Sequence, residues 1–141
     1  MHETLLEISL PADACNLREI RDKIRNATLT LTDCVETVDR IILAINEACM
    51  NVIQHAYPND YNGQRDIVLD LYRDENYLVI LVKDHAPTVD PGNIKPRDLN
   101  DIRPGGLGVH FIREIMNEVE YLGQTGEFGN VLMMKIKLVN Q

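Results

Sequence analysis

The sequence lacks several features that would direct it to particular partners or compartments. Its 141 residues contain no apolar run long enough to cross a bilayer, so we expect no membrane-spanning segment. The first ten residues, MHETLLEISL, include acidic residues and no basic n-region, which argues against a signal peptide and favours the cytoplasm. Nothing resembles a basic stripe, and the formal net charge is −8, so nucleic acid is not an expected partner.

Cysteine is scarce and widely spaced. The three residues are Cys15, Cys34 and Cys49, an odd number without a Cys-x-x-Cys pair. We therefore expect buried reduced thiols rather than a disulfide framework or a zinc site. The hydrophobic fraction of 45% and the charged fraction of 26% are ordinary for a globular protein. With this length, they predict a single domain over residues 1–141 that can bury a sizeable core.

Hydrophobic periodicity predicts the order strand, helix, helix, strand, strand, loop, helix, strand, strand. The expected strands cover residues 5–10, 66–74, 76–84, 119–122 and 131–139, and the expected helices cover 13–27, 35–56 and a stretch beginning at PGGLG (104–108). Residues 85–104 hold four prolines and form a long loop, which is usually functional or mobile. Successive strands without an intervening helix pair antiparallel. The predicted fold is therefore α+β, a two-layer α/β sandwich with helices on one face of a mixed, mostly antiparallel sheet.

Two polar residues interrupt the second predicted helix, within NEACMNVIQHAY (46–57). Glu47 and Asn51 are four residues apart, and with His55 they follow one side of the helix along the border of its apolar stripe. A border position lets a side chain face a cleft while the core holds its backbone. Such polar residues are also common on any amphipathic helix, so this pattern does not identify a site by itself.

Two further stretches contain candidate ligand contacts. Asp84 ends an apolar strand and can accept hydrogen bonds from a ligand amino group, although a solvated strand-end aspartate explains it equally simply. The stretch RPGGLGVHFIREIM (103–116) places three glycines at a helix start, where free N–H groups and the helix dipole suit phosphate. A hinge before a helix would have the same glycines. The stretch is not a P-loop, because no Lys-Ser or Lys-Thr pair follows, and no strand leads into it as in the dinucleotide fingerprint.

Taken in order, these motifs resemble the GHKL ATPase/kinase superfamily with its Bergerat ATP-binding fold. NEACMNVIQHAY resembles its N box, Asp84 begins the equivalent of its first glycine box, and RPGGLGVHFI resembles its second glycine box. The sequence is most similar to the bacterial anti-sigma-factor serine/threonine kinases, whose N box typically ends in His-Ala-Tyr or His-Gly-Tyr, as residues 55–57 do here. The resemblance covers essentially the whole chain.

The resemblance implies a role for each matching residue. Asn51 would coordinate the Mg²⁺ that bridges the ATP phosphates, and Glu47 would be the general base that takes the proton from an attacking serine hydroxyl. Asp84 would bind the adenine amino group, and Arg103 would offset γ-phosphate charge. Asn130 falls where the superfamily often has a threonine near adenine. The other nucleotide-binding residues would be Ala86, Val89, Gly105, Gly106, Leu107, Gly108 and Val109.

The resemblance also implies partners. An anti-sigma-factor kinase uses ATP and Mg²⁺ to phosphorylate a serine of an antagonist with a STAS domain, binds a sigma factor or a similar target, and forms a homodimer. One position departs from the family pattern: Ala86 replaces the glycine that lies against adenine, and its methyl group could be tolerated or could weaken or reshape nucleotide binding. Two alternatives stay open: a catalytically weak or inactive nucleotide-binding partner-switch module, and a detached catalytic domain of a two-component kinase.

Overall fold

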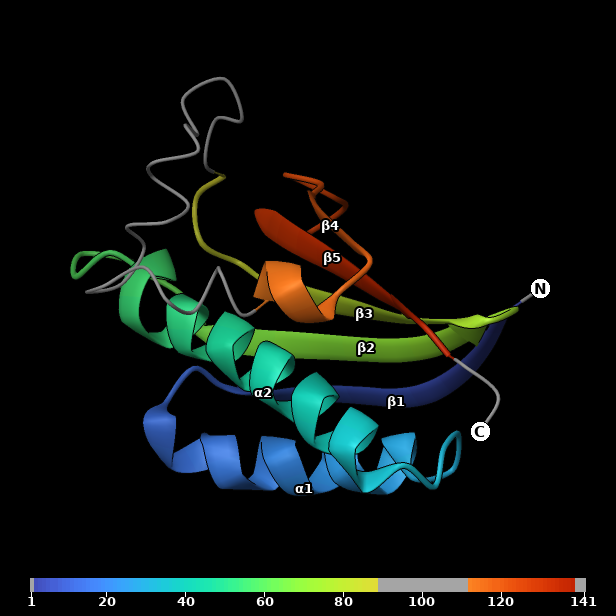
Figure 1. Cartoon of the computed structure of the whole chain (residues 1–141). Coiled ribbons are helices and arrows are strands. Elements are labelled where there is room, and N and C mark those ends of the chain that lie inside the picture. The colour runs from blue at the N-terminus through green and yellow to red at the C-terminus, as the bar shows by residue number, and fades with distance from the viewer. Residues whose placement is uncertain (1, 89–111, 139–141) are drawn as a thin grey trace.

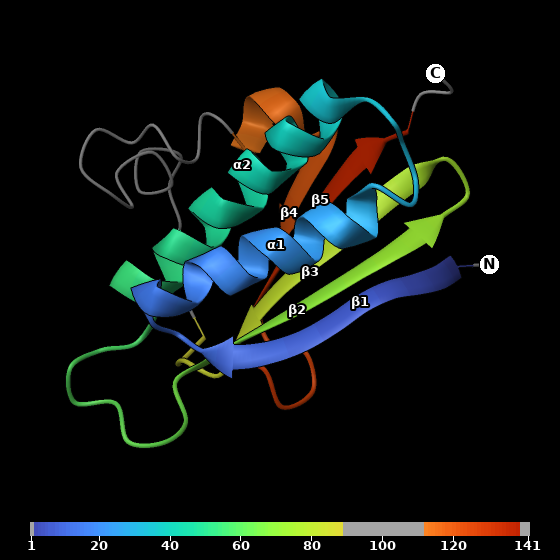
Figure 2. The same cartoon turned by 90° about the horizontal axis from the view of Figure 1, so that it is seen from below.

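The computed structural model describes residues 2–88 and 112–138, in which two long helices cover one face of a five-stranded sheet (Figure 1). Figure 2 shows the same two layers from the helix side. The elements are β1 (His2–Pro11), the short 3₁₀ turn η1 (Ala14–Asn16), α1 (Leu17–Thr28), α2 (Val35–Asn51), the π-helical turn η2 (Val52–Ala56), β2 (Asp66–Asp74), β3 (Tyr77–Asp84), β4 (Glu118–Tyr121) and β5 (Asn130–Lys137). The predicted two-layer α+β architecture is confirmed. None of the helices in this part of the chain is long and apolar enough to cross a membrane.

The strand order in the sheet is β1-β2-β3-β5-β4, and every pairing among the described strands is antiparallel. The last strand, β5, lies between β3 and β4 instead of at an edge. The chain therefore leaves β3 at Asp84 and returns beside it at Asn130, which is the register partner of Asp84. This register brings together two residues that are 46 positions apart in the sequence.

The core lies between the sheet and the helices. Alternate residues of the central strands face the helices, and Leu71, Leu78 and Ile80 are fully buried there. From α2, Val38, Ile41 and Ile45 supply the facing side chains, and they are fully buried as well. The third predicted helix is represented by helical residues 112–115, and its Ile112 and the following Met116 belong to the same core cluster. Its glycine-rich start lies outside the described residues.

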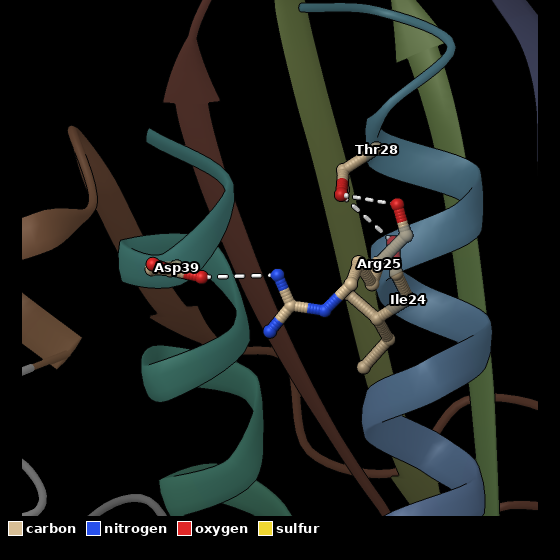
Figure 3. Close-up of polar contacts among 4 residues, drawn as sticks. All are labelled: Ile24, Arg25, Thr28 and Asp39. Atoms are coloured by element: carbon tan, nitrogen blue, oxygen red, sulfur yellow. Dashed lines mark hydrogen bonds and ion pairs between the residues drawn. The ribbon is translucent and has the colours of Figure 1, made fainter. Parts of the chain in front are cut away.

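Polar contacts join α1 to α2 along their solvent side. The guanidinium of Arg25 donates to Asp39 at 3.1 Å, and Arg21 donates to the side-chain oxygen of Asn46, also at 3.1 Å (Figure 3 shows the first). The buried Thr28 hydroxyl donates to the carbonyl of Ile24 at 2.8 Å, so the last turn of α1 satisfies its own polar group. The first two contacts link α1 to the helix that carries Glu47 and Asn51, and the packing of the two helices comes from their buried apolar side chains.

The second helix ends differently from the prediction of a uniform helix to residue 56. Regular α-helix stops at Asn51, and the next five residues form the π-helical turn η2. Glu47 and Asn51 are half-buried, as expected for the border of the apolar stripe, whereas His55 is exposed. A π-helical turn changes the rotation per residue, so His55 does not continue the side of the helix that Glu47 and Asn51 share.

Candidate functional site

Asp84 is the centre of a buried polar cluster at the end of β3. It is only 5% exposed, and its Oδ1 accepts hydrogen bonds from the backbone N–H of Ala86 at 3.0 Å and from the side-chain amide of Asn130 at 2.8 Å. Burial raises the pKa of the Asp84 carboxyl above its ordinary value, and the two hydrogen bonds act against that rise. Both of these donors bond to Oδ1, and a carboxylate has a second oxygen, Oδ2, that can accept from a ligand.

A second layer of contacts fixes the orientation of the Asn130 amide. The hydroxyl of Tyr121, at the end of β4, contacts the side-chain oxygen of Asn130. The Asn130 NH₂ group is thereby turned toward Asp84, and it also donates to the carbonyl of Pro87 at 3.2 Å. Because both donors to Asp84 are fixed, its carboxylate presents an acceptor in one defined direction.

Close backbone packing surrounds Ala86, which the sequence resemblance sets against a glycine of the first glycine box. Ala86 is 1% exposed, so its methyl group is enclosed by the protein. A Cβ added at Gly129 would lie 1.8 Å from the Ala86 carbonyl oxygen, far inside van der Waals contact. The Gly129 N–H also donates to the Asp84 carbonyl at 3.0 Å. Glycine at 129 thus permits the close approach on which the Asp84 cluster depends.

We expect Gly129→Ala to lower the free energy of unfolding by about 2 to 3 kcal/mol, because the new methyl group would force apart two backbone segments. Thermal unfolding followed by circular dichroism measures this loss. Gly126→Ala is the matched control: its Cβ would meet nothing within 4 Å, and its φ of +61° predicts a smaller cost of about 1 kcal/mol. A Gly129→Ala protein at least as stable as the control would contradict this account.

Two tyrosines that follow the second helix hold the residue after Asp84. The Tyr57 hydroxyl donates to the carbonyl of Asp66 at 2.6 Å and accepts from the His85 N–H at 2.9 Å. The Tyr61 hydroxyl donates to the His85 carbonyl at 3.1 Å, and the two tyrosine rings are 4.8 Å apart. Burial raises the pKa of Tyr57 to about 12, so the hydroxyl keeps its proton for the bond to Asp66 at physiological pH.

Glu47 and Asn51 lie one turn apart near the C-terminal end of α2. Figure 2 shows this end of α2 on the same side of the molecule as the end of β3, where Asp84 lies. The side-chain oxygen Oδ1 of Asn51 is buried and has no hydrogen-bond partner among residues 2–88 and 112–138. A buried amide oxygen without a partner costs about 1 to 3 kcal/mol, and a hard cation such as Mg²⁺ would satisfy it. The residue therefore fits the magnesium ligand that the family resemblance implies.

The structure thus describes five of the predicted site residues. Asp84, Ala86 and Asn130 are brought together at the ends of β3 and β5, and Glu47 and Asn51 lie on α2. The other predicted residues lie outside the described part of the chain: Val89, Arg103, Gly105, Gly106, Leu107, Gly108 and Val109. Their roles stay predictions.

Four residues of the cluster were given no role from the sequence: Tyr57, Tyr61, Tyr121 and Gly129. Tyr57 did belong to the His-Ala-Tyr ending of the N box, and Tyr61 is an aromatic residue in an otherwise polar turn, YPNDYNG. These were the available signals. The contacts of Tyr121 and Gly129 depend on the return of β5 beside β3, for which the sequence shows no local signal.

Comparison with known proteins finds relatives of this chain in sequence and in fold. The sequence profile of the histidine kinase-like ATPase domain matches residues 10–136. Curated relatives include proteins named serine-protein kinase RsbW from Bacillus cereus, 31% identical over 138 residues, and from Bacillus anthracis, 30% identical over 138 residues. In each case the match covers 92% of this chain and 83% of the relative.

Solved structures share the fold at lower sequence identity. The RsbU and RsbW domains of Rv1364c from Mycobacterium tuberculosis match with a TM-score of 0.67 and 18% identity, over 96% of this chain and 33% of that one. The SiaB-SiaC complex from Pseudomonas aeruginosa contains a chain that matches with a TM-score of 0.62 and 15% identity, over 94% of this chain and 89% of that one.

Proposed function

The chain belongs to the histidine kinase-like ATPase domain family, and on this premise we propose that it is an ATP-dependent serine/threonine protein kinase of the anti-sigma-factor type. Its residues 1–141 would act as one ATP-binding domain in the cytoplasm, phosphorylating a serine of an antagonist with a STAS domain. The observation that carries the proposal is the buried side-chain oxygen of Asn51, which has no hydrogen-bond partner among the described residues and lies in the N-box motif. The buried Asp84 carboxylate, at the start of the first glycine-box motif, supplies the second acceptor. Relatives named serine-protein kinase support the reaction class.

In the proposed mechanism, Asp84 positions ATP by accepting a hydrogen bond from the adenine 6-amino group. Asn51 would hold Mg²⁺ through Oδ1, and the ion, when bound, supplies positive charge against the triphosphate. Glu47 takes the proton from the serine hydroxyl of the partner. The serine oxygen then bonds to the γ-phosphorus, the bond from phosphorus to the β,γ-bridging oxygen breaks, and ADP leaves.

The proposed partners are the antagonist, a sigma factor or similar target, and a second copy of this chain. The homodimer is proposed from the resemblance to the anti-sigma-factor kinases. The sheet face that the helices leave uncovered is mixed in character, since the buried Val131 lies beside the Lys83–Asp70 ion pair.

Phosphorylation of a cognate antagonist tests the proposal. With Mg²⁺ and γ-labelled ATP, we expect the purified chain to transfer label to a serine of the antagonist, and removal of Mg²⁺ with a chelator to stop the transfer. Asn51→Ala should lower the rate by about 100-fold, because a metal ligand beside the reacting phosphate is lost. Asn46→Ala, at a neighbouring half-buried position of α2, is the control and should retain the rate within about threefold. Equal rates for Asn51→Ala and wild type would remove Asn51 as the metal ligand.

A second candidate function is a nucleotide-binding partner switch without turnover, which is motivated by Ala86 in place of the glycine of the first glycine box. Calorimetric titration with Mg-ATP and Mg-ADP separates the two: a chain that binds nucleotide but transfers no phosphate is the switch, and a chain that binds neither is not the kinase.

A further inference from the structure

We propose that Tyr57 and Tyr61 are positioning residues that hold the backbone on either side of His85 and so aim the Asp84 carboxylate at the nucleotide base. The inference rests on the proposed function, since it concerns how the base is recognised. It is carried by the hydrogen bonds of two consecutive peptide units.

The peptide unit between Asp84 and His85 is held at both of its polar groups. Its carbonyl, that of Asp84, accepts from the Gly129 N–H at 3.0 Å, and its N–H, that of His85, donates to the Tyr57 hydroxyl at 2.9 Å. Because a peptide unit is planar, fixing both groups fixes the plane from which the Asp84 side chain leaves the chain.

The next peptide unit is held in the same way. Its carbonyl, that of His85, accepts from the Tyr61 hydroxyl at 3.1 Å. Its N–H, that of Ala86, donates to Asp84 Oδ1 at 3.0 Å. The peptide unit between His85 and Ala86 is therefore bonded to Tyr61 at its carbonyl and to Asp84 at its N–H. Because the unit is rigid, loss of the Tyr61 hydrogen bond allows the Asp84 carboxylate to turn.

Tyr57 also ties this unit to the second helix. It directly follows the η2 turn, which begins after Asn51, and its hydroxyl donates to the Asp66 carbonyl at the start of β2. The Tyr57 hydroxyl therefore joins the segment that follows Asn51, the proposed metal ligand, to His85, which follows the base acceptor Asp84. The ring of Tyr61 packs against that of Tyr57 at 4.8 Å, which supports both hydroxyl positions.

Base selectivity tests this role. ATP carries a 6-amino group that donates to Asp84, whereas purine riboside triphosphate lacks it and differs in nothing else. We expect Tyr57→Phe to weaken Mg-ATP binding by about five- to tenfold, as measured by titration calorimetry, and to leave Mg-purine riboside triphosphate binding within about twofold. Tyr61→Phe should act in the same direction with a smaller effect, because it removes one hydrogen bond instead of two.

Two controls complete the experiment. Tyr72→Phe changes a half-buried tyrosine on the far face of the sheet, against His2, and should alter neither affinity. In an Asp84→Asn background, Tyr57→Phe should cause no further loss of ATP affinity, since the acceptor that it positions is already gone. Amide hydrogen exchange in a peptide covering residues 84–88 should speed up in Tyr57→Phe and stay unchanged in Tyr72→Phe, with or without nucleotide.

The outcomes separate the two proposals. A wild-type chain that binds neither nucleotide overturns the proposed function, and the inference with it. If the wild-type chain binds ATP, two results for Tyr57→Phe overturn the positioning role alone. The first is wild-type affinity for both nucleotides, and the second is an equal loss of affinity for both. Unchanged exchange at residues 84–88 in Tyr57→Phe also overturns it.

Discussion

Glu47→Gln is expected to reduce phosphoryl transfer to the antagonist by about 10²- to 10⁴-fold while nucleotide affinity stays within about threefold of wild type. The amide has nearly the same shape as the carboxylate but cannot take the proton from the serine hydroxyl. Glu47 is half-buried near the C-terminal end of α2, one turn before Asn51, so the change alters a proton acceptor without removing a core side chain. Single-turnover transfer of labelled phosphate measures the first effect, and calorimetry with Mg-ADP measures the second.

The matched control for this variant is Glu36→Gln in the first turn of the same helix. Glu36 is exposed and lies far from the end of α2 that carries the proposed site, so its rate should equal that of wild type. Full activity in Glu47→Gln would remove Glu47 as the general base. A loss of nucleotide binding together with activity would instead assign Glu47 a structural role.

Asp84→Asn is expected to weaken ATP binding by about 30- to 100-fold. The two donors that surround Oδ1, the Ala86 N–H and the Asn130 NH₂, would select the amide orientation that keeps an oxygen between them. The new NH₂ group then takes the place of Oδ2 and meets the adenine amino group donor to donor. Calorimetry with Mg-ATP measures the loss, and thermal unfolding checks that the fold is kept.

Acidification should act on the wild-type chain in the same direction. Burial raises the pKa of Asp84, so its carboxylate becomes protonated, and loses its role as an acceptor, at a higher pH than an exposed aspartate would. ATP affinity is therefore present above this pKa and lost as the pH falls through it, whereas Asp84→Asn should lack that dependence.

Asp70→Asn, which breaks the ion pair with Lys83 on the far face of the sheet, is the control and should leave the affinity unchanged. An Asp84→Asn protein that binds ATP like wild type would exclude Asp84 as the base acceptor.

Local sequence signals were sufficient to predict the elements and the layer architecture. Alternation in DIVLDLYRD and the step of three and four residues from Val38 to Cys49 are periodicities that a single segment carries by itself. The strand and helix positions agree with β2, β3 and α2 to within a few residues. The π-helical turn after Asn51 was not predicted, because its sequence, VIQHA, continues the same apolar spacing.

The candidate site shows the same difference between local motifs and contacts from distant segments. Glu47, Asn51 and Asp84 were proposed from contiguous motifs and from the family resemblance that those motifs carry. The contacts that orient Asp84 were not found. Gly129 and Asn130 bond to Asp84 directly, whereas Tyr57 acts through the His85 N–H and Tyr121 acts through Asn130.

By itself, then, the sequence determined which residues can serve as acceptors and which segments carry them. Only the tertiary structure decided that β5 returns beside β3, that Gly129 passes against Ala86, and that a phenol on the segment after α2 holds the peptide after Asp84. The physical reason is that hydrogen-bond direction and close packing depend on angles and distances between segments far apart in the chain, and no local periodicity encodes those quantities.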